Sequence, residues 1–141
     1  MLSSEIQVRV RYAETDKMGY VYYGNYAQYY EIGRTEFMRK RGITYRELED
    51  SGIMLPVLSL NSKFIRPARY DDLLTIKTTL TEIPQTRITF QYEIYNQNGE
   101  LVNKGDTMLV FVNVHTHRPI KAPQELLNKL ADDVYKKSII V

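Results

Sequence analysis

The chain has 141 residues, of which 43% are hydrophobic and 26% charged, and its formal net charge at neutral pH is +2. This composition is ordinary for a globular protein with a buried core, and so small a charge does not by itself indicate a nucleic-acid partner. The absence of cysteine excludes disulfide scaffolds, thiolate nucleophiles and cysteine-ligated zinc. With no signal-peptide pattern and no apolar run of membrane length, we expect a single cytoplasmic domain over residues 1–141.

The N-terminal part of the chain predicts a strand followed by a long helix. Apolar and polar side chains alternate over residues 6–12, as in a half-buried strand. After a turn at Gly19, a helix is predicted from Asn25, which suits the N-cap position, to about Arg41. Gly33 interrupts the apolar stripe of this helix at a cost of about 1 kcal/mol in helix propensity, which indicates that the helix approaches a sheet closely.

The rest of the chain predicts mainly strands. A short helical turn over 45–51 precedes four extended segments, which are marked by Leu58 to Phe64, Leu74 to Leu80, Ile88 to Ile94 and about Leu101 to Val114. Leu58, Leu60 and Phe64 are expected to face inward. Asn98-Gly99 is a hairpin signal, and Gly105 suggests a β-bulge. The run 108–112 is apolar on both faces, which is typical of a central strand with both faces covered.

A last helix is expected to begin near Pro123, with Leu126, Leu130 and Val134 on its apolar stripe. A long helix that precedes several consecutive strands indicates the α+β class, with an antiparallel sheet on one face of the helix.

The segment from Tyr12 to Tyr26 holds the candidate active site. Asp16 follows the first predicted strand, and a glycine turn and the start of the helix come directly after it. A carboxylate beside a helix N-terminus combines a nucleophile or base with backbone N–H donors that stabilise a developing negative charge. The surrounding aromatic residues offer a dry lining, so the arrangement suits attack on a carbonyl carbon. From the residues alone, Asp16 also fits a turn or capping aspartate.

Three separated motifs give the chain a resemblance to a known family. They are Tyr12 to Tyr26, Tyr29-Tyr30-Glu31 with Arg34, and Pro67 to Leu73. In this order they resemble acyl-CoA thioesterases of the hot-dog fold, in the branch that includes 4-hydroxybenzoyl-CoA thioesterase and the Tol–Pal-associated thioesterases. The resemblance implies a curved antiparallel sheet of five or six strands around one long central helix. It also implies hydrolysis of an acyl-CoA thioester to free acid and coenzyme A, without a metal or other cofactor.

The resemblance also implies roles for individual residues. Asp16 takes the position of the catalytic carboxylate, as nucleophile or general base, and the backbone N–H of Tyr23 that of the group polarising the carbonyl. Four more residues match the motif around the helix start and are expected to bind substrate: Tyr22, Gly24, Asn25 and Tyr26. The coenzyme A phosphates are expected near basic residues at strand ends, for which the candidates are Lys63, Arg66, Arg69 and Arg87. The family places its sites at a dimer interface, and the doubly apolar run 108–112 needs cover beyond that given by the helix, so a homodimer or homotetramer is expected.

Several residues have a structural interpretation beside the functional one. The cluster Lys63, Arg66 and Arg69 also fits a solvated strand end. Glu14 is interpreted as a solvated or supporting charge, and Glu31 as the ion-pair partner of Arg34 rather than a contact for a polar substrate tail. The helix-stripe residues Tyr26 and Tyr29 are preferred as core.

The sequence leaves the acyl group and two other activities open. Position 23 is commonly histidine in the Tol–Pal-associated branch. This chain has tyrosine there, as 4-hydroxybenzoyl-CoA thioesterase does, so the motif does not decide the acyl group. A non-catalytic module that binds acyl-CoA or acyl-carrier protein would keep the pocket without needing Asp16. A hydratase would need a His–Asp pair, which the segment from Tyr12 to Tyr26 lacks. His115 and His117 alone are weak evidence for a metal.

Overall fold

The computed structural model describes residues 2–131. The helical elements are a short 3₁₀ turn η1 (Tyr12–Glu14), the long helix α1 (Asn25–Arg39), the short helix α2 (Tyr45–Asp50) and a helix over 124–131. The strands are β1 (Leu2–Arg9), β2 (Ile53–Met54), β3 (Val57–Phe64), β4 (Leu73–Leu80), β5 (Arg87–Tyr95), β6 (Leu101–Val110) and β7 (Val112–Asn113).

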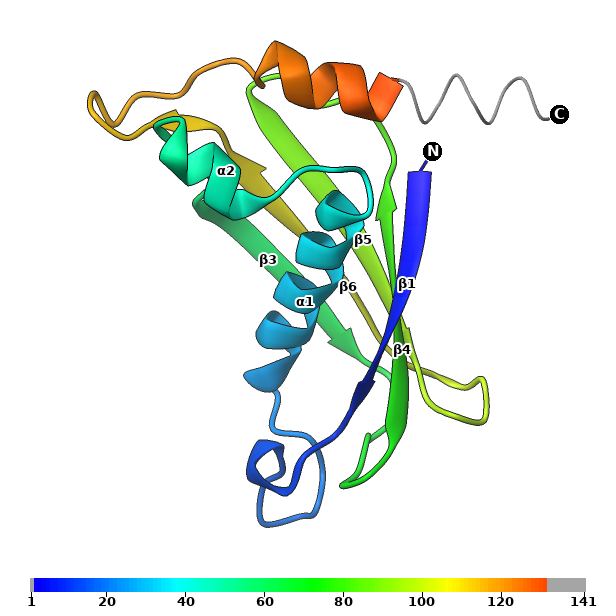
Figure 1. The fold of residues 1–141 in the computed structure, drawn as a ribbon. Helices are drawn as coiled ribbons and strands as arrows, with labels where there is room; N and C mark the ends of the chain where they lie inside the picture. The colour runs from blue at the N-terminus through cyan, green and yellow to red at the C-terminus, as the bar shows by residue number, and fades with distance from the viewer. Residues whose placement is uncertain (1, 132–141) are drawn as a thin grey trace, which may run out of the picture.

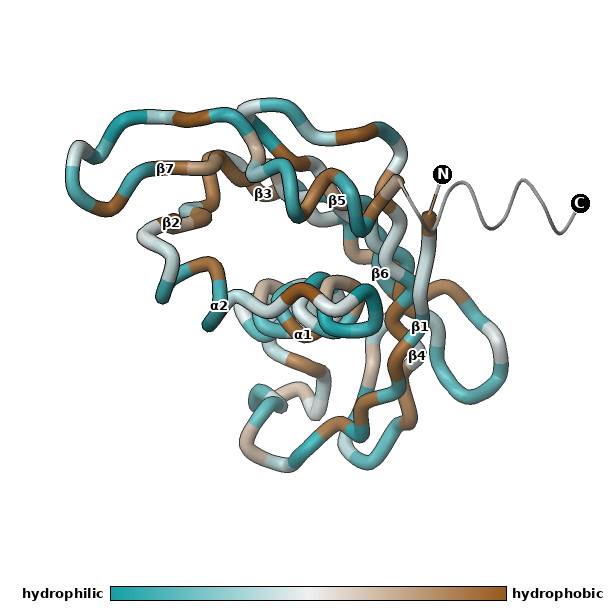
Figure 2. Tube along the Cα trace, turned by 45° about the horizontal axis from the view of Figure 1, so that its top comes forward, coloured by the Kyte–Doolittle hydropathy of each residue, from teal (hydrophilic) through white to brown (hydrophobic). Residues whose placement is uncertain are grey.

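Five of the strands form one antiparallel sheet in the order β1-β4-β5-β6-β3, and β2 pairs with β7 in a separate two-stranded ladder. Helix α1 lies across this sheet (Figure 1), and strands flank the helix on two sides in Figure 2. The sheet therefore curves around the helix. This confirms the α+β class and the hot-dog arrangement, with the smaller of the two expected strand numbers.

Alternation along the strands places the core between the sheet and α1. Every second residue of β4 and β5 is buried, which matches the predicted inward face. Tyr30 of α1 stacks on Tyr92 of β5 with 4.3 Å between ring centroids, and Phe37 meets Phe90 edge-on at 5.6 Å. Each large side chain buried in this way contributes roughly 1.5–3 kcal/mol to folding. Tyr26 and Tyr29 are buried too, as predicted.

Glycine allows α1 to lie close to the sheet. A Cβ atom at Gly33 would collide with Thr78 Oγ1 and would lie 2.9 Å from Ile76 Cγ2, both on β4. The close approach predicted from Gly33 is confirmed. Gly105 acts in the same way, because a Cβ there would meet the Tyr30 hydroxyl. The predicted bulge at Gly105 is wrong, since this residue pairs in regular register with both neighbouring strands.

The strand ends differ from the sequence expectation. The first strand covers Leu2–Arg9 rather than 6–12, because Val10 N donates to Asp72 O and the chain then turns into η1. The last long strand ends at Val110, since Phe111 N donates to Thr86 O. The 108–112 run is therefore not one strand. Strand β6 lies next to the sheet edge rather than at the centre.

Strand β3 forms that edge; Phe64 faces α1 as expected, where it packs edge-on against Tyr26, but the apolar residues of the strand are not buried. Leu58 is 51% exposed, Leu60 42% and Phe64 55%. Their alternation is real, but within this chain α1 covers Phe64 only in part and leaves Leu58 and Leu60 exposed. The result is an unpaired strand edge beside exposed apolar side chains.

The helix over 124–131 begins one residue after Pro123, with Leu126 and Leu130 buried as expected. Val134 lies outside the described residues. Within residues 2–131, no helix is long and apolar enough to cross a membrane.

Candidate active site

The loop between β1 and α1 is held by a buried carboxylate. Glu14 Oε1 accepts hydrogen bonds from Arg11 N at 2.8 Å and from the Tyr29 hydroxyl at 3.1 Å. The Glu14 carbonyl accepts from Tyr22 N at 2.9 Å and from Asn25 Nδ2 at 2.7 Å. Glu14 thus fixes the loop to the first turns of α1. Of the two interpretations of Glu14, the supporting charge is confirmed and the solvated charge is wrong.

Asp16 lies in a tight turn inside this loop. Its Oδ1 accepts from Met18 N at 2.9 Å and from Tyr20 N at 3.2 Å, and its backbone N–H donates to Tyr20 O at 2.8 Å. Thr15 and Val21 form a bridge across the same turn. In the part of the chain that the structure describes, Asp16 Oδ2 makes no hydrogen bond. One oxygen fixes the carboxylate, and the other is available to a substrate.

Asp16 lines a pocket of about 350 Å³ together with the start of α1 and the end of β3. Tyr23, Tyr26 and Phe64 supply aromatic lining, with Tyr26 and Phe64 edge-on at 5.5 Å between centroids. The Tyr23 side chain is 66% exposed. The backbone N–H of Tyr23 lies just before the first helical residue, and it donates no hydrogen bond to any of residues 2–131. The pocket thus combines an available carboxylate oxygen with an available N–H at the positive end of a helix.

The other predicted substrate residues surround this helix start in different ways. Tyr22 is half-exposed and packs against the Tyr23 ring with 4.5 Å between centroids. Gly24 is the N-cap of α1, and Asn25, expected to be the cap, is the first helical residue. Asn25 binds the loop through its side chain instead. Burial raises the pKa of Tyr26 to about 12, so its hydroxyl stays protonated at neutral pH.

The four basic candidates are not brought together. Arg66 lines the Asp16 pocket and its guanidinium lies 3.4 Å from Glu100 Oε2. Arg69 lies over the Tyr20 ring, 5.0 Å from its centroid. Arg87 stands at the far end of β5, where it pairs with Val110.

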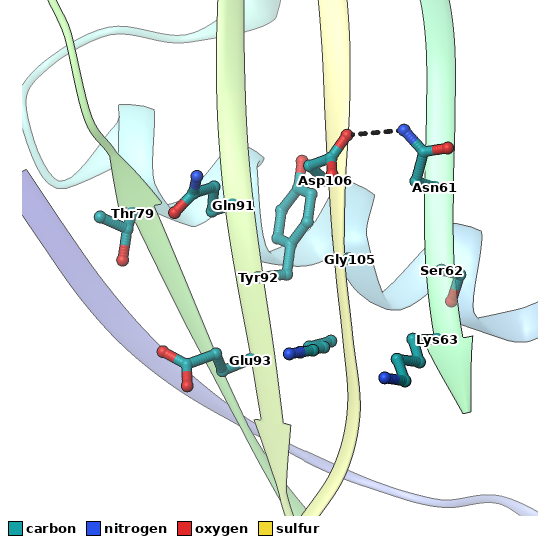
Figure 3. Close-up of a pocket in the computed structure, with 10 residues that line it drawn as sticks. Asn61, Ser62, Lys63, Thr79, Gln91, Tyr92, Glu93, Gly105 and Asp106 are labelled. Atoms are coloured by element: carbon teal, nitrogen blue, oxygen red, sulfur yellow. Dashed lines mark hydrogen bonds between the residues drawn. The ribbon is translucent and has the colours of Figure 1, made fainter. Parts of the chain in front are cut away.

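Lys63 is on the outer face of the sheet, in a polar groove of about 450 Å³ that Figure 3 shows with α1 behind the strands. Asn61 Nδ2 donates to Asp106 Oδ1 at 3.0 Å across this groove. Lys63 is directly opposite Lys104 in the β3–β6 register. Like charges in such a pair repel, and an anion between them would relieve the repulsion.

Two further expectations concern Glu31, Arg34 and the histidines. The predicted Glu31–Arg34 ion pair is wrong, because no ion pair joins them although both residues are described. His115 and His117 lie in the exposed turn after β7. Over residues 2–131, no group of three potential ligands is placed to hold a metal.

Comparison with known proteins identifies the class. Residues 10–130 match the Thioesterase-like superfamily. The acyl-CoA thioester hydrolase YbgC of Escherichia coli O157:H7 is 31% identical over 120 residues, which cover 85% of this chain and 90% of the relative. The chain belongs to the thioesterase-like superfamily, and the resemblance drawn from the motifs is confirmed.

Solved structures agree with this assignment. DHNA-CoA thioesterase from Staphylococcus aureus superposes with a TM-score of 0.90 at 31% identity, covering 100% of this chain and 97% of the other. 4-Hydroxybenzoyl-CoA thioesterase, in a complex with 4-hydroxybenzoyl-CoA, gives a TM-score of 0.81 at 26% identity, with coverage of 90% and 97%. Both are thioesterases, so fold and family point to the same class.

Some residues that line the pockets or support the loop could not be identified from the sequence. Lys104 was missed because cross-strand register is not visible in one strand. The role of Glu14 depends on Tyr29, which is 15 residues away in the chain. Tyr45 carried no motif signal at all.

Proposed function

We propose that the chain hydrolyses acyl-CoA thioesters to free acid and coenzyme A, with Asp16 as the catalytic carboxylate. One observation carries this proposal: Asp16 shares an aromatic pocket with the start of α1, with Oδ1 fixed by two backbone N–H groups and Oδ2 available. The superfamily assignment and the relatives named for acyl-CoA hydrolysis support the substrate class.

The reaction needs little beyond these groups. A thioester carbonyl is already electrophilic, and a thiolate leaves readily, so the site must supply a nucleophile or base and a donor for the oxyanion. The Tyr23 N–H, at the positive end of α1, is the proposed oxyanion donor. One such donor typically contributes about 3–4 kcal/mol to transition-state stabilisation.

Two routes remain for Asp16. In the first, Oδ2 attacks the carbonyl carbon, the C–S bond breaks, coenzyme A leaves as thiolate, and water hydrolyses the mixed anhydride. In the second, Asp16 takes a proton from a water molecule as the water oxygen attacks the carbonyl carbon, the C–S bond of the tetrahedral intermediate then breaks, and the departing thiolate takes up the proton. Rapid-quench analysis separates them, because only the first releases thiol before free acid.

For coenzyme A, we propose that Arg66 at the pocket and the Lys63–Lys104 pair on the outer face meet the phosphates. Arg66 is at the pocket wall, and Lys63 lies three residues before it, on the other side of the sheet edge. Arg69 and Arg87 are weaker candidates, because Arg69 lies on Tyr20 and Arg87 is about 13 Å along β5 from Gln91, the nearest groove residue of that strand.

We further propose a homodimer in which β3 pairs antiparallel with β3 of a second copy, with a homotetramer as the next level of assembly. The expected reason for assembly was cover for the 108–112 run, but Leu109 to Val112 are already buried within the chain. We propose instead that dimerisation covers the unpaired edge of β3 and its exposed apolar side chains. Such pairing is two-fold symmetric and places each Asp16 pocket against the second copy.

Hydrolysis assays with released thiol as the signal test the proposal. The substrates are acyl-CoAs of different chain length and aromaticity, together with an acyl-carrier-protein thioester. Asp16→Asn keeps an oxygen for the Met18 and Tyr20 N–H groups, so the loop survives while turnover falls roughly 10²–10⁴-fold. The matched control is Asp50→Asn on the exposed side of α2. Hydrolysis by Asp16→Asn at the wild-type rate would refute the assignment.

The alternative from another class is a non-catalytic acyl-CoA binding module. It predicts acyl-CoA binding without thiol release for every substrate, and binding unaffected by Asp16→Asn. A hydratase is disfavoured, since the Asp16 pocket has no histidine in its lining. We also propose the cytoplasmic localisation that the sequence predicts.

A further inference from the structure

A second hollow, of about 330 Å³, lies between α1, α2 and β2. It shares no lining residue with the Asp16 pocket. Along α1, residues 26, 30 and 34 form one stripe with a spacing of four. Tyr26 lines the Asp16 pocket, Arg34 lines the second hollow, and the fully buried Tyr30 stands between them. Within one chain the two spaces are therefore separate.

Arg34 is the unusual member of this hollow. Its side chain is in the core layer, with only 9% of the residue exposed, and it makes no ion pair with any described residue. Glu31 and Glu49 line the same hollow, but both are solvent-exposed and neither pairs with it. The Tyr45 and Tyr92 hydroxyls are its hydrogen-bonding neighbours, and neither of them neutralises its charge. A guanidinium held out of water without a carboxylate is costly, so an anion bound in the hollow would stabilise it.

The Tyr45 hydroxyl supplies a second donor without an acceptor. This oxygen is enclosed and donates to no acceptor among residues 2–131, and the Arg34 guanidinium beside it is itself a donor. Burial raises the pKa of Tyr45 to about 12, and the nearby Arg34 guanidinium opposes this increase, as it does for Tyr92. Two hydrogen-bond donors, one of them charged, thus lie side by side in the hollow.

Apart from Thr35 and the two exposed glutamates, the rest of the lining is apolar, with Leu48, Ile53, Leu55 and Leu109 around the two donors. A carboxylate is the planar acceptor that matches the guanidinium fork, and a methylene chain matches the apolar walls. We infer that this hollow binds a carboxylate at the far end of the acyl group, so that the preferred substrates are monothioesters of dicarboxylic acids. The inference rests on the proposed function, since it names the substrate class of that site.

The proposed dimer explains how an acyl chain reaches Arg34. Phe64, at one end of β3, lines the Asp16 pocket, and Val57, at the other end, pairs with Leu109, which lines the second hollow. An antiparallel second copy of β3 places its own Phe64 end opposite this Val57 end. The thioester bound at one copy's Asp16 then points its acyl chain towards the other copy's Arg34.

The kinetic test compares substrates that differ only in their far end. Adipyl-, suberyl- and sebacyl-CoA are measured against hexanoyl-, octanoyl- and decanoyl-CoA, with thiol release as the signal. Wild type is expected to prefer at least one carboxylate-ended member by about 10- to 100-fold in kcat/KM, the effect of one charge-assisted contact. Arg34→Gln should remove this preference and leave the methyl-ended substrates within about threefold.

Two further variants keep the result interpretable. Tyr45→Phe removes a hydroxyl that donates to no acceptor among the described residues, so the protein should still fold, and the preference should fall several-fold. Arg46→Gln removes the same charge from the exposed side of α2 and should change nothing. If Arg34→Gln lowers kcat/KM equally for both substrate series while Tyr45→Phe has no effect, Arg34 is structural and the inference is overturned.

A binding arm separates this inference from the proposed function. Free suberate should raise the melting temperature of the wild-type chain more than octanoate does, and Arg34→Gln should abolish the difference. If no acyl-CoA is hydrolysed but suberate binding depends on Arg34, the proposed function fails and the carboxylate site stands. If acyl-CoAs are hydrolysed without preference and suberate does not bind, the carboxylate site fails alone.

Discussion

Replacement of Gly33 by alanine tests how closely α1 packs on the sheet. The added Cβ would overlap Thr78 Oγ1 and lie 2.9 Å from Ile76 Cγ2. Both atoms are attached to β-branched residues of an interior strand, where only rotation about χ1 moves them. Thr78 and Ile76 are fully buried, so there is no open space into which they can rotate. The helix must move away from the sheet, or the strand must shift.

The size of the effect follows from two opposing contributions. Overpacking of this kind costs about 1–3 kcal/mol. Alanine stabilises a helix by about 1 kcal/mol relative to glycine, which offsets part of that cost. We therefore expect Gly33→Ala to lower the free energy of unfolding by up to about 2 kcal/mol. On an exposed face of the same helix, Gln28→Ala should stay within about 0.5 kcal/mol of wild type.

Urea denaturation followed by circular dichroism measures both variants, and a double mutant adds a sharper test. In a Thr78→Ala background the oxygen is gone and only the Ile76 contact remains, so Gly33→Ala should cost less there. The expected coupling between positions 33 and 78 is about 0.5–2 kcal/mol. A Gly33→Ala protein that is more stable than wild type by the full helix-propensity increment would refute the close-approach reasoning.

Three more predictions follow from the site and its supports. Burial raises the pKa of Tyr26 and Tyr30 to about 12 from 10.0, so their stabilisation is complete below pH 10 and is lost as the pH rises towards 12. Urea unfolding at pH 9 and pH 11.5 should show a loss of about 2 kcal/mol per tyrosine, out of about 2.7 kcal/mol for the complete titration, and equal stability at both pH values would contradict it. Tyr29→Phe removes a donor from buried Glu14 and should cost about 1.5–3 kcal/mol in unfolding free energy. Neutralising Arg66 or Lys63 should raise KM for acyl-CoA, flatten its salt dependence and leave acyl-pantetheine kinetics unchanged; untouched acyl-CoA kinetics in both variants would place the phosphates elsewhere.

The elements that sequence alone could predict are those set by local pattern. The alternation of apolar and polar residues located β4 and β5, because each of these strands has a single buried face. Gly33 indicated that α1 packs closely on the sheet, because glycine in a helix costs stability unless a close contact requires it. The residues at which strands end were harder to predict from the sequence. Whether Val10 continues a ladder depends on Asp72, which is far away in the chain.

Sequence pattern also could not show which faces remain uncovered. The alternation of β3 is as regular as that of β4, yet Leu58 and Leu60 are exposed where Leu74 and Ile76 are buried. Periodicity reports that one face is apolar, but it does not report what covers that face. The same limit applies to the Glu31–Arg34 pair. Spacing on a helix permits that pair, and the burial of Arg34 prevents it.

The edge of the sheet and the Asp16 pocket share residues, which couples assembly to the chemistry. Phe64 belongs to the unpaired strand and also lines the pocket, and Ile65 and Arg66 follow it there. A second copy that pairs with β3 therefore adds a wall to the pocket at the same time as it buries the exposed apolar side chains. On the proposed mechanism, we expect water to be excluded from the thioester only in the assembled state, where the helix N-terminus and Asp16 would act most strongly on it. A monomer that keeps full activity, seen by light scattering at assay concentration, would break this coupling and remove the shared site.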